Sequence, residues 1–280
     1  MNLLNRTRLL LTLGCLAVAS PAGAVGTRYF ELDSGSDFEG GDLQGTSIVD
    51  SGEVRAGMRL GSVPLTGAQQ TIWAALDLGD GRTLLALGSE GRLVTVKGEK
   101  VEPAGDVGGL AATSLVRAWD GLVLVGVLPG NKLMSWKDGK LTEFVQLPGV
   151  EHIWGLAWDA SQQVVYVVTG PEGKLWRITR DKHAEVFFDA EQDHLVSVAV
   201  GPKGVVYAGA SDRSILYRVT GPGRAEVVRD FGLTEVRALA VSSAGEVWAI
   251  VNDIRRSRAS SSSSADRNRS KSTTSSSSSE

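Results

Sequence analysis

Short runs of hydrophobic residues, separated by turns rich in Gly, Pro, Asp and Ser, follow one another through most of the chain. The clearest series is "IWGLAWD" (153–159), "VVYVVTG" (164–170), "KLWRIT" (174–179) and "AEVFFD" (184–189). Such short runs, rich in Val, Leu, Ile and aromatic residues and bounded by turn residues, are typical of β-strands. No apolar period of 3.6 residues persists here, so we expect no helix in this region.

The four-strand pattern returns at a spacing of 40–42 residues. Its copies begin near Gln69, Leu110, Glu151, Gln192 and Thr234. Four short antiparallel strands in a unit of this length make one blade of a β-propeller, and each blade buries its faces against its neighbours. The sequence therefore predicts an all-β propeller of four-stranded blades over residues 69–254.

The turn between the second and third strands of a blade gives the repeat its most recognisable strings, "GSEGRLVTV" (88–96) and "GPEGKLWRI" (170–178). We expect Gly91 or Gly173 to take the positive φ that a tight hairpin needs. A phosphate-binding role for these glycines is not favoured, because no helix follows to offer its N-terminus.

The last copy of the repeat supplies only two strands, "VRALAV" (236–241) and "EVWAIVN" (246–252). The chain then enters a segment rich in Ser and Arg, residues 255–280, whose composition predicts a disordered tail or insertion. Either an N-terminal hairpin completes the blade or the chain belongs to a longer protein, and we favour the second explanation. The unpaired edge is expected to self-associate.

The first 24 residues have the features of an export signal. Arg6 and Arg8 precede an apolar run, and Ala22 to Ala24 supply small residues for cleavage. An alternative is lipid attachment at Cys15, the single cysteine, but Thr12 departs from the usual lipoprotein pattern. We therefore expect a periplasmic or secreted protein, with a disulfide-free mature chain and no transmembrane segment.

An N-terminal segment, residues 25–68, precedes the repeats. Its part "TSIVDSGEVRAGM" (46–58) predicts a strand hairpin that turns at Ser51-Gly52. The preceding "DSGSDFEGGDLQG" is acidic and rich in Gly. Calcium binding is one interpretation, but the spacing fits no calcium loop, and a solvated entry segment is favoured.

The charge is unevenly distributed. Residues 255–280 hold six Arg or Lys against two acidic residues and residues 1–24 hold two Arg, which leaves a charge of −9 for residues 25–254 of a chain whose total is −3. Nucleic-acid phosphates require a basic surface, so this acidic region argues against nucleic acid as a partner.

Known catalytic motifs are missing from the sequence: there is no HExxH, CxxC, GxSxG or P-loop pattern. The best candidate site comes from the repeat, where Glu151-His152 and Asp193-His194 occupy one register and Glu235 follows in the next copy. We expect these side chains to line one rim of the central channel. They could hold a divalent metal or act as bases, or they could be duplicated turns without a role.

The chain resembles the β-propeller superfamily of WD-repeat, NHL-like and YVTN-like proteins over residues 69–251, and it is most similar to uncharacterised secreted propellers of myxobacteria. The predicted signal, "TRYFELDSGSDFEGG" (27–41) and the "GPEGKLWRI" repeat carry this resemblance. Trp119-Asp120 and Trp158-Asp159 spell the WD dipeptide, but both stand at the end of a first strand, not a third.

Two functions follow as hypotheses. The first is an exported, non-enzymatic binding or scaffold module without a cofactor, whose partner is a protein or a carbohydrate. The second is a metal-dependent propeller hydrolase or lactonase with its site in the central channel. The seven tryptophans are expected to pack between blades, with carbohydrate stacking as the alternative.

Overall fold

The computed structural model describes residues 31–57, 61–65, 71–88 and 90–253. The chain separates into two compact units, one ending at Ser62 and one beginning at Val63. The predicted export signal with Cys15, and the predicted tail 255–280, lie outside the described residues.

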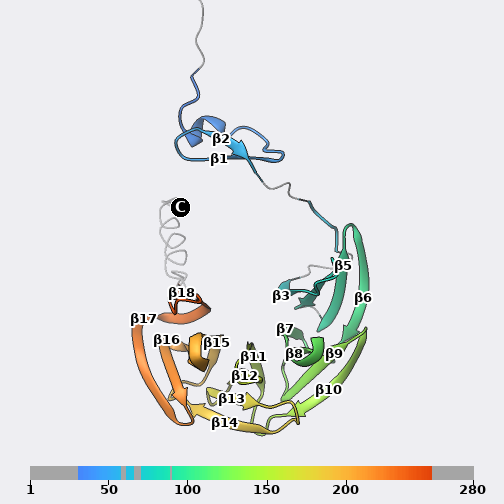
Figure 1. Ribbon diagram of the computed structural model, residues 1–280, viewed down its shortest axis with the longest axis vertical. Coiled ribbons are helices and arrows are strands. Elements are labelled where there is room, and N and C mark those ends of the chain that lie inside the picture. The colour runs from blue at the N-terminus through green and yellow to red at the C-terminus, as the bar shows by residue number, and fades with distance from the viewer. Residues whose placement is uncertain (1–30, 58–60, 66–70, 89, 254–280) are drawn as a thin grey trace, which may run out of the picture. The chain divides into compact units, whose positions relative to one another are not determined.

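The second unit is built from antiparallel blades that follow one another in an arc, with β3, β7, β11 and β15 on its inner side (Figure 1). Each blade pairs its strands in chain order. The first three blades contain β3 (Ile72–Asp77), β4 (Thr83–Leu87), β5 (Arg92–Lys97) and β6 (Lys100–Asp106); β7 (Ala111–Arg117), β8 (Val123–Leu128), β9 (Lys132–Lys137) and β10 (Lys140–Gln146); and β11 (His152–Asp159), β12 (Val164–Gly170), β13 (Lys174–Ile178) and β14 (Ala184–Asp189).

The fourth blade runs on without a break into a fifth. It contains β15 (Leu195–Val200), the long strand β16 (Val206–Gly221) and the first half of β17 (Arg224–Val241). The second half of β17 pairs with β18 (Val247–Asn252), from Glu235 opposite Asn252 to Val241 opposite Val247. The described chain thus holds four complete blades and two strands of a fifth, as the repeat predicts.

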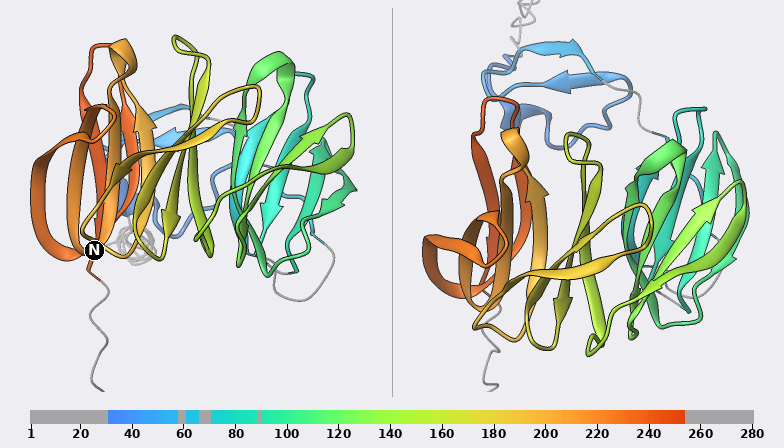
Figure 2. Two further views of the ribbon diagram at one scale, coloured as in Figure 1. Left: turned by 90° about the horizontal axis from the view of Figure 1, so that it is seen from below. Right: turned by 60° about the horizontal axis from the view of Figure 1, so that its bottom comes forward.

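Figure 2 shows the blades side by side along the arc. Three hydrophobic clusters lie between adjacent blades and hold them together. Strand β12 shows why its whole sequence is apolar. Val165 and Val167 pack toward the second blade, whereas Tyr166 and Val168 pack toward the fourth, and all four are fully buried. Burying an aliphatic side chain contributes about 1.5–3 kcal/mol, so each blade is stabilised by both of its neighbours.

Two details differ from the sequence prediction. The sequence predicted that Trp119-Asp120 ends the first strand of the second blade, but β7 already ends at Arg117. Residues Trp119–Gly121 form a short 3-10 turn instead, because Asp120 takes a φ of 50°. Trp119 is therefore buried in a turn, not in a strand.

The glycines of the blade turns serve two purposes. Gly91 has the predicted positive φ of 60°, but in the third blade Glu172 takes that conformation with a φ of 61° and Gly173 does not. Gly173 is required for space, because a Cβ atom there would lie 2.4 Å from the carbonyl oxygen of Gln192.

The first unit contains a 3-10 turn, η1 (Gly35–Phe38), and the predicted hairpin, formed by β1 (Thr46–Ile48) and β2 (Val54–Ala56). The Asp37 carboxylate accepts hydrogen bonds from the backbone and side chain of Ser34. These bonds lower the pKa of Asp37. The acidic segment thus uses this carboxylate to cap its own turn.

Candidate functional site

The inner strands of all five blades begin in the same register. In each blade one residue stands opposite the end of the second strand, and in the third blade it is His152, opposite Gly170. The equivalent residues of the five blades, in chain order, are Thr71, Ala111, His152, His194 and Glu235. The structure therefore places three of the five predicted site residues at equivalent positions of consecutive blades.

A β-bulge follows this position in every inner strand. In the third blade the pairing skips Trp154, between Ile153 and Gly155. The equivalent extra residues are Trp73, Thr113, Trp154, Val196 and Arg237. A bulge re-aims the side chain of its extra residue and is frequent beside functional sites. Five re-aimed side chains thus lie at the same end of the inner strands.

His152, Trp154 and His194 form a compact group, which we call the imidazole cluster. The ring centres of His152 and His194 lie 5.5 Å apart, and Trp154 lies 5.4 Å from the first and 5.7 Å from the second. The indole Nε1 of Trp154 donates a hydrogen bond of 3.2 Å to Nδ1 of His194. Neutral His194 therefore carries its proton on Nε2, which leaves that atom as a donor.

Gly170 makes room for the cluster. A Cβ atom at this position would lie 1.9 Å from Nδ1 of His194, well inside the sum of the atomic radii. In the fourth blade Ser211 stands at the same place. The fit between His194 and Gly170 is thus specific to the contact between the third and fourth blades.

His152 carries an unused hydrogen-bonding atom. Its Nδ1 is buried and has no partner in the part of the chain that the structure describes. Leaving a buried polar atom without a partner costs about 1–3 kcal/mol. A buried polar atom without a partner calls for an explanation in a native structure, and its place beside three aromatic rings makes this cluster the candidate site.

The acidic members of the predicted site do not join the imidazoles. Glu151 and Asp193 are exposed, and Glu235 accepts a hydrogen bond of 3.0 Å from Asn252 of its own blade. Within the described ranges, no group of three or more His, Cys, Asp or Glu side chains is arranged to hold a metal ion.

A second aromatic contact links the first and fifth blades. The guanidinium carbon of Arg237 lies 5.7 Å from the ring centre of Trp73. Both are bulge residues of inner strands, and a cation over an aromatic ring at this distance is attracted by the ring. The inner strands at the two ends of the arc therefore approach closely enough for their long side chains to meet.

Sequence reasoning missed Trp154, Gly170 and the Trp73–Arg237 contact. The signal was present in the recurrence of "IW" at 72–73 and 153–154, which we interpreted as packing between blades. Packing does describe Trp119, Trp136 and Trp176, which are buried and donate their indole N–H to atoms of the surrounding strands and turns. His183, in the connection between β13 and β14, is exposed.

Comparisons with known proteins show the fold. No protein-family model and no curated protein sequence matches the chain. Among solved structures, it is similar to virginiamycin B lyase from Staphylococcus aureus, with a TM-score of 0.59, 14% identity and coverage of 73% of this chain and 69% of that one. It is also similar to the extracellular domain of a one-component system of B. thetaiotaomicron (TM-score 0.55, 16% identity, 68% and 27% covered).

A third similar structure is described as that of a putative gluconolactonase (TM-score 0.51, 16% identity, 74% and 77% covered). These similarities establish a propeller-like protein with four-stranded blades. The neighbours include enzymes as well as an extracellular domain, so the fold leaves the activity open. Within the described residues, no helix is both long enough and apolar enough to cross a membrane.

Proposed function

We propose that this protein is an exported, non-enzymatic propeller that binds a ligand at the imidazole cluster. The observation that carries the proposal is the buried, unpartnered Nδ1 of His152 beside a preformed pair of aromatic rings. The cluster combines flat apolar surface with hydrogen-bonding nitrogens, the combination that ligand sites use for affinity and orientation.

The chemistry of the cluster favours a neutral ligand with hydroxyl or amide groups. Nε2 of His194 offers a donor, and the faces of Trp154 and the two imidazoles offer surface for stacking. A sugar ring or an exposed peptide segment has these properties. Both agree with the carbohydrate or protein partner that the sequence suggests.

A metal-dependent hydrolase or lactonase is the second candidate. Two imidazoles with ring centres 5.5 Å apart favour it, since His is the commonest ligand of transition metals. Catalytic zinc sites use three protein ligands and an open position. The imidazole cluster offers two, and within the described residues no third His, Cys, Asp or Glu side chain completes a metal-binding group.

The first experiment uses the three histidines of the chain as reporters. A panel of methyl hexopyranosides and short neutral peptides is added to the purified protein, and the imidazole carbon-bound protons are followed by proton–carbon correlation NMR. A bound probe should shift the signals of His152 and His194 and leave that of His183 unchanged. Binding that moves neither cluster histidine would place the ligand elsewhere and refute the proposal.

The second experiment separates binding from catalysis. The metal content and the hydrolysis of glucono-δ-lactone are measured for the wild type, His152→Ala and His194→Ala, with His183→Ala as the matched control. We expect no stoichiometric metal and no hydrolysis above the spontaneous rate in any of them. Metal and hydrolysis that are lost in both cluster variants, and kept in the control, would establish the enzyme instead.

A further inference from the structure

A cavity, which we call the flank pocket, lies between the outer strands of the third and fourth blades. Its volume is about 410 Å³, within the range of about 300–1,000 Å³ that is usual for ligand pockets. Its walls come from the end of β14, the loop that follows, and the outer parts of β16 and β17. None of its residues belongs to the imidazole cluster.

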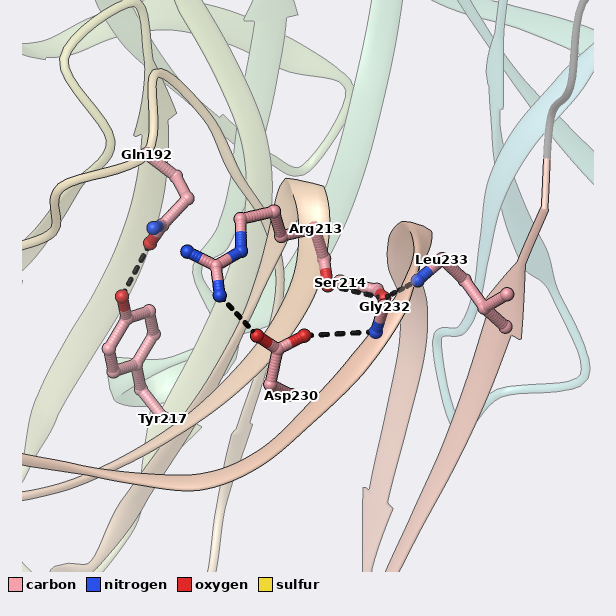
Figure 3. Close-up of polar contacts among 7 residues, drawn as sticks. All are labelled: Gln192, Arg213, Ser214, Tyr217, Asp230, Gly232 and Leu233. Carbon is pink, nitrogen blue, oxygen red and sulfur yellow. Dashed lines mark hydrogen bonds and ion pairs between the residues drawn. The ribbon is translucent and has the colours of Figure 1, made fainter.

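The floor of the flank pocket is aromatic and rigid. The rings of Phe188 and Tyr217 lie 5.0 Å apart, and Ile215 beside them is buried. The hydroxyl of Tyr217 donates a hydrogen bond to the side-chain oxygen of Gln192, which fixes the ring (Figure 3). The floor is therefore formed before any ligand arrives.

The rim of the flank pocket carries three carboxylates and one guanidinium, so its charge is negative. Asp230 is already satisfied, because it accepts bonds from Arg213 at 2.6 Å and from the backbone of Gly232 at 2.9 Å (Figure 3). Lys174 stands opposite Asp189 across a strand pair, but its ammonium pairs with Glu172. Asp189 and Glu191 are therefore the two exposed carboxylates of the rim that a ligand can reach.

Arg213 is held over the pocket by an unusual turn. Asp212, Arg213 and Ser214 have φ values of 57°, 133° and 51°. In the second blade the position of Arg213 is occupied by Gly130, with a φ of 153°, and such a conformation costs a residue with a side chain about 1–3 kcal/mol.

The hydroxyl of Ser214 stabilises this turn. It donates to the carbonyl oxygen of Arg213 at 2.6 Å and accepts from the backbone N–H of Leu233 at 2.9 Å (Figure 3). The fourth blade thus keeps a strained arginine where another blade has glycine. This turn holds the guanidinium of Arg213 at the rim of the pocket, where it pairs with Asp230.

We propose that the flank pocket binds an organic cation, a primary ammonium group on an apolar stem. The apolar stem would pack on the rings of Phe188 and Tyr217, and the ammonium would pair with the exposed carboxylates of Asp189 and Glu191. Arg213 already pairs with Asp230. Its positive charge therefore competes with the ammonium for the carboxylates of the rim and limits the affinity of the pocket for the amine. The amine is therefore favoured over an anion, which would meet three carboxylates.

The test uses three probes that share one stem: pentylammonium, 1-pentanol and pentanoate. Binding to the full chain is measured by saturation-transfer difference NMR. Pentylammonium should bind, and the other two should not. Glu191→Gln should weaken binding about threefold, the effect of one exposed ion pair. Arg213→Gln should strengthen binding by a similar factor, because it removes the competing charge.

The matched control is Glu226→Gln, which removes the same charge from β17 next to Arg218, outside the pocket. It should leave amine binding unchanged, and so should His194→Ala, since the two sites are independent. Equal binding of 1-pentanol would reduce the pocket to an apolar surface. Preferred binding of pentanoate, equal effects of Glu191→Gln and Glu226→Gln, or no binding of pentylammonium would each overturn the proposal.

Discussion

The third and fifth blades place the same kinds of residue in the same register, yet with opposite exposure. Tyr166 in β12 is equivalent to Trp248 in β18, and Val168 to Ile250. The first residue of each pair is fully buried, whereas Trp248 is 54% exposed and Ile250 is 63% exposed. The face of β12 that carries Tyr166 and Val168 packs against the fourth blade. In the described structure, no blade packs against the equivalent face of β18.

This difference shows that a blade is not an independent folding unit. The second strand of a blade is apolar on both faces because it packs against two neighbouring blades. The blade is therefore stabilised by contacts between blades rather than by its own sheet. Functional positions follow the same rule, since the imidazole cluster and the flank pocket both lie where the third and fourth blades meet.

The largest expected effect comes from truncating the two equivalent aromatics. Tyr166→Ala should lower the free energy of unfolding by about 4 kcal/mol, the usual cost of removing a buried aromatic ring. Trp248→Ala should change it by less than about 0.5 kcal/mol, as at exposed positions. Urea denaturation measures both. A large loss of stability in Trp248→Ala would mean that this face of the fifth blade is covered, and the two blades would then not differ in exposure.

A second substitution tests the contact between the third and fourth blades. Gly170→Ala should destabilise the protein by about 2 kcal/mol, since its methyl group collides with the ring of His194. Gly221→Ala is the control, because a Cβ there meets nothing closer than 3.7 Å. If the two variants are equally stable, His194 does not lie against Gly170.

The exposed face of the fifth blade predicts association between copies of the chain. In the described structure β18 pairs with β17 alone, and such an edge tends to pair with another strand. Replacing Trp248 and Ile250 with Lys should weaken self-association about tenfold, or about 1.4 kcal/mol, in sedimentation equilibrium. Added salt should not abolish the association of the wild type. A wild type that is monomeric at all concentrations contradicts this prediction.

The smallest effect concerns alkaline pH. Burial raises the pKa of the Tyr166 and Tyr217 phenols above the usual value of about 10. The folded state then holds more protons than the unfolded chain, so stability should fall as the pH rises from about 10 toward the raised values. Tyr217→Phe should make this fall shallower in urea titrations at several pH values. An unchanged slope would mean that Tyr217 ionises as freely in the folded state as in the unfolded chain.

The sequence was sufficient for the blades and their order, because a strand buried on both faces needs a continuous apolar run, but it misplaced the end of β7 and the positive φ of the turn before β13. It also placed His152 and His194 at equivalent positions. It could not supply the partners of these residues. The contact of His194 with Gly170 depends on how two blades pack, and the strained turn at Arg213 has no signature in residue type. Both arise from contacts between segments that lie far apart in the chain.

Neighbouring blades bring His152, Trp154 and His194 together. The most direct test is proton–carbon correlation NMR of the three imidazoles in the wild type and in Trp154→Phe, which removes the hydrogen bond to His194 but keeps an aromatic ring. The signals of His194 and His152 should shift, with that of His194 shifting more, and the signal of His183 should stay in place. Unchanged signals for both cluster histidines would contradict the account.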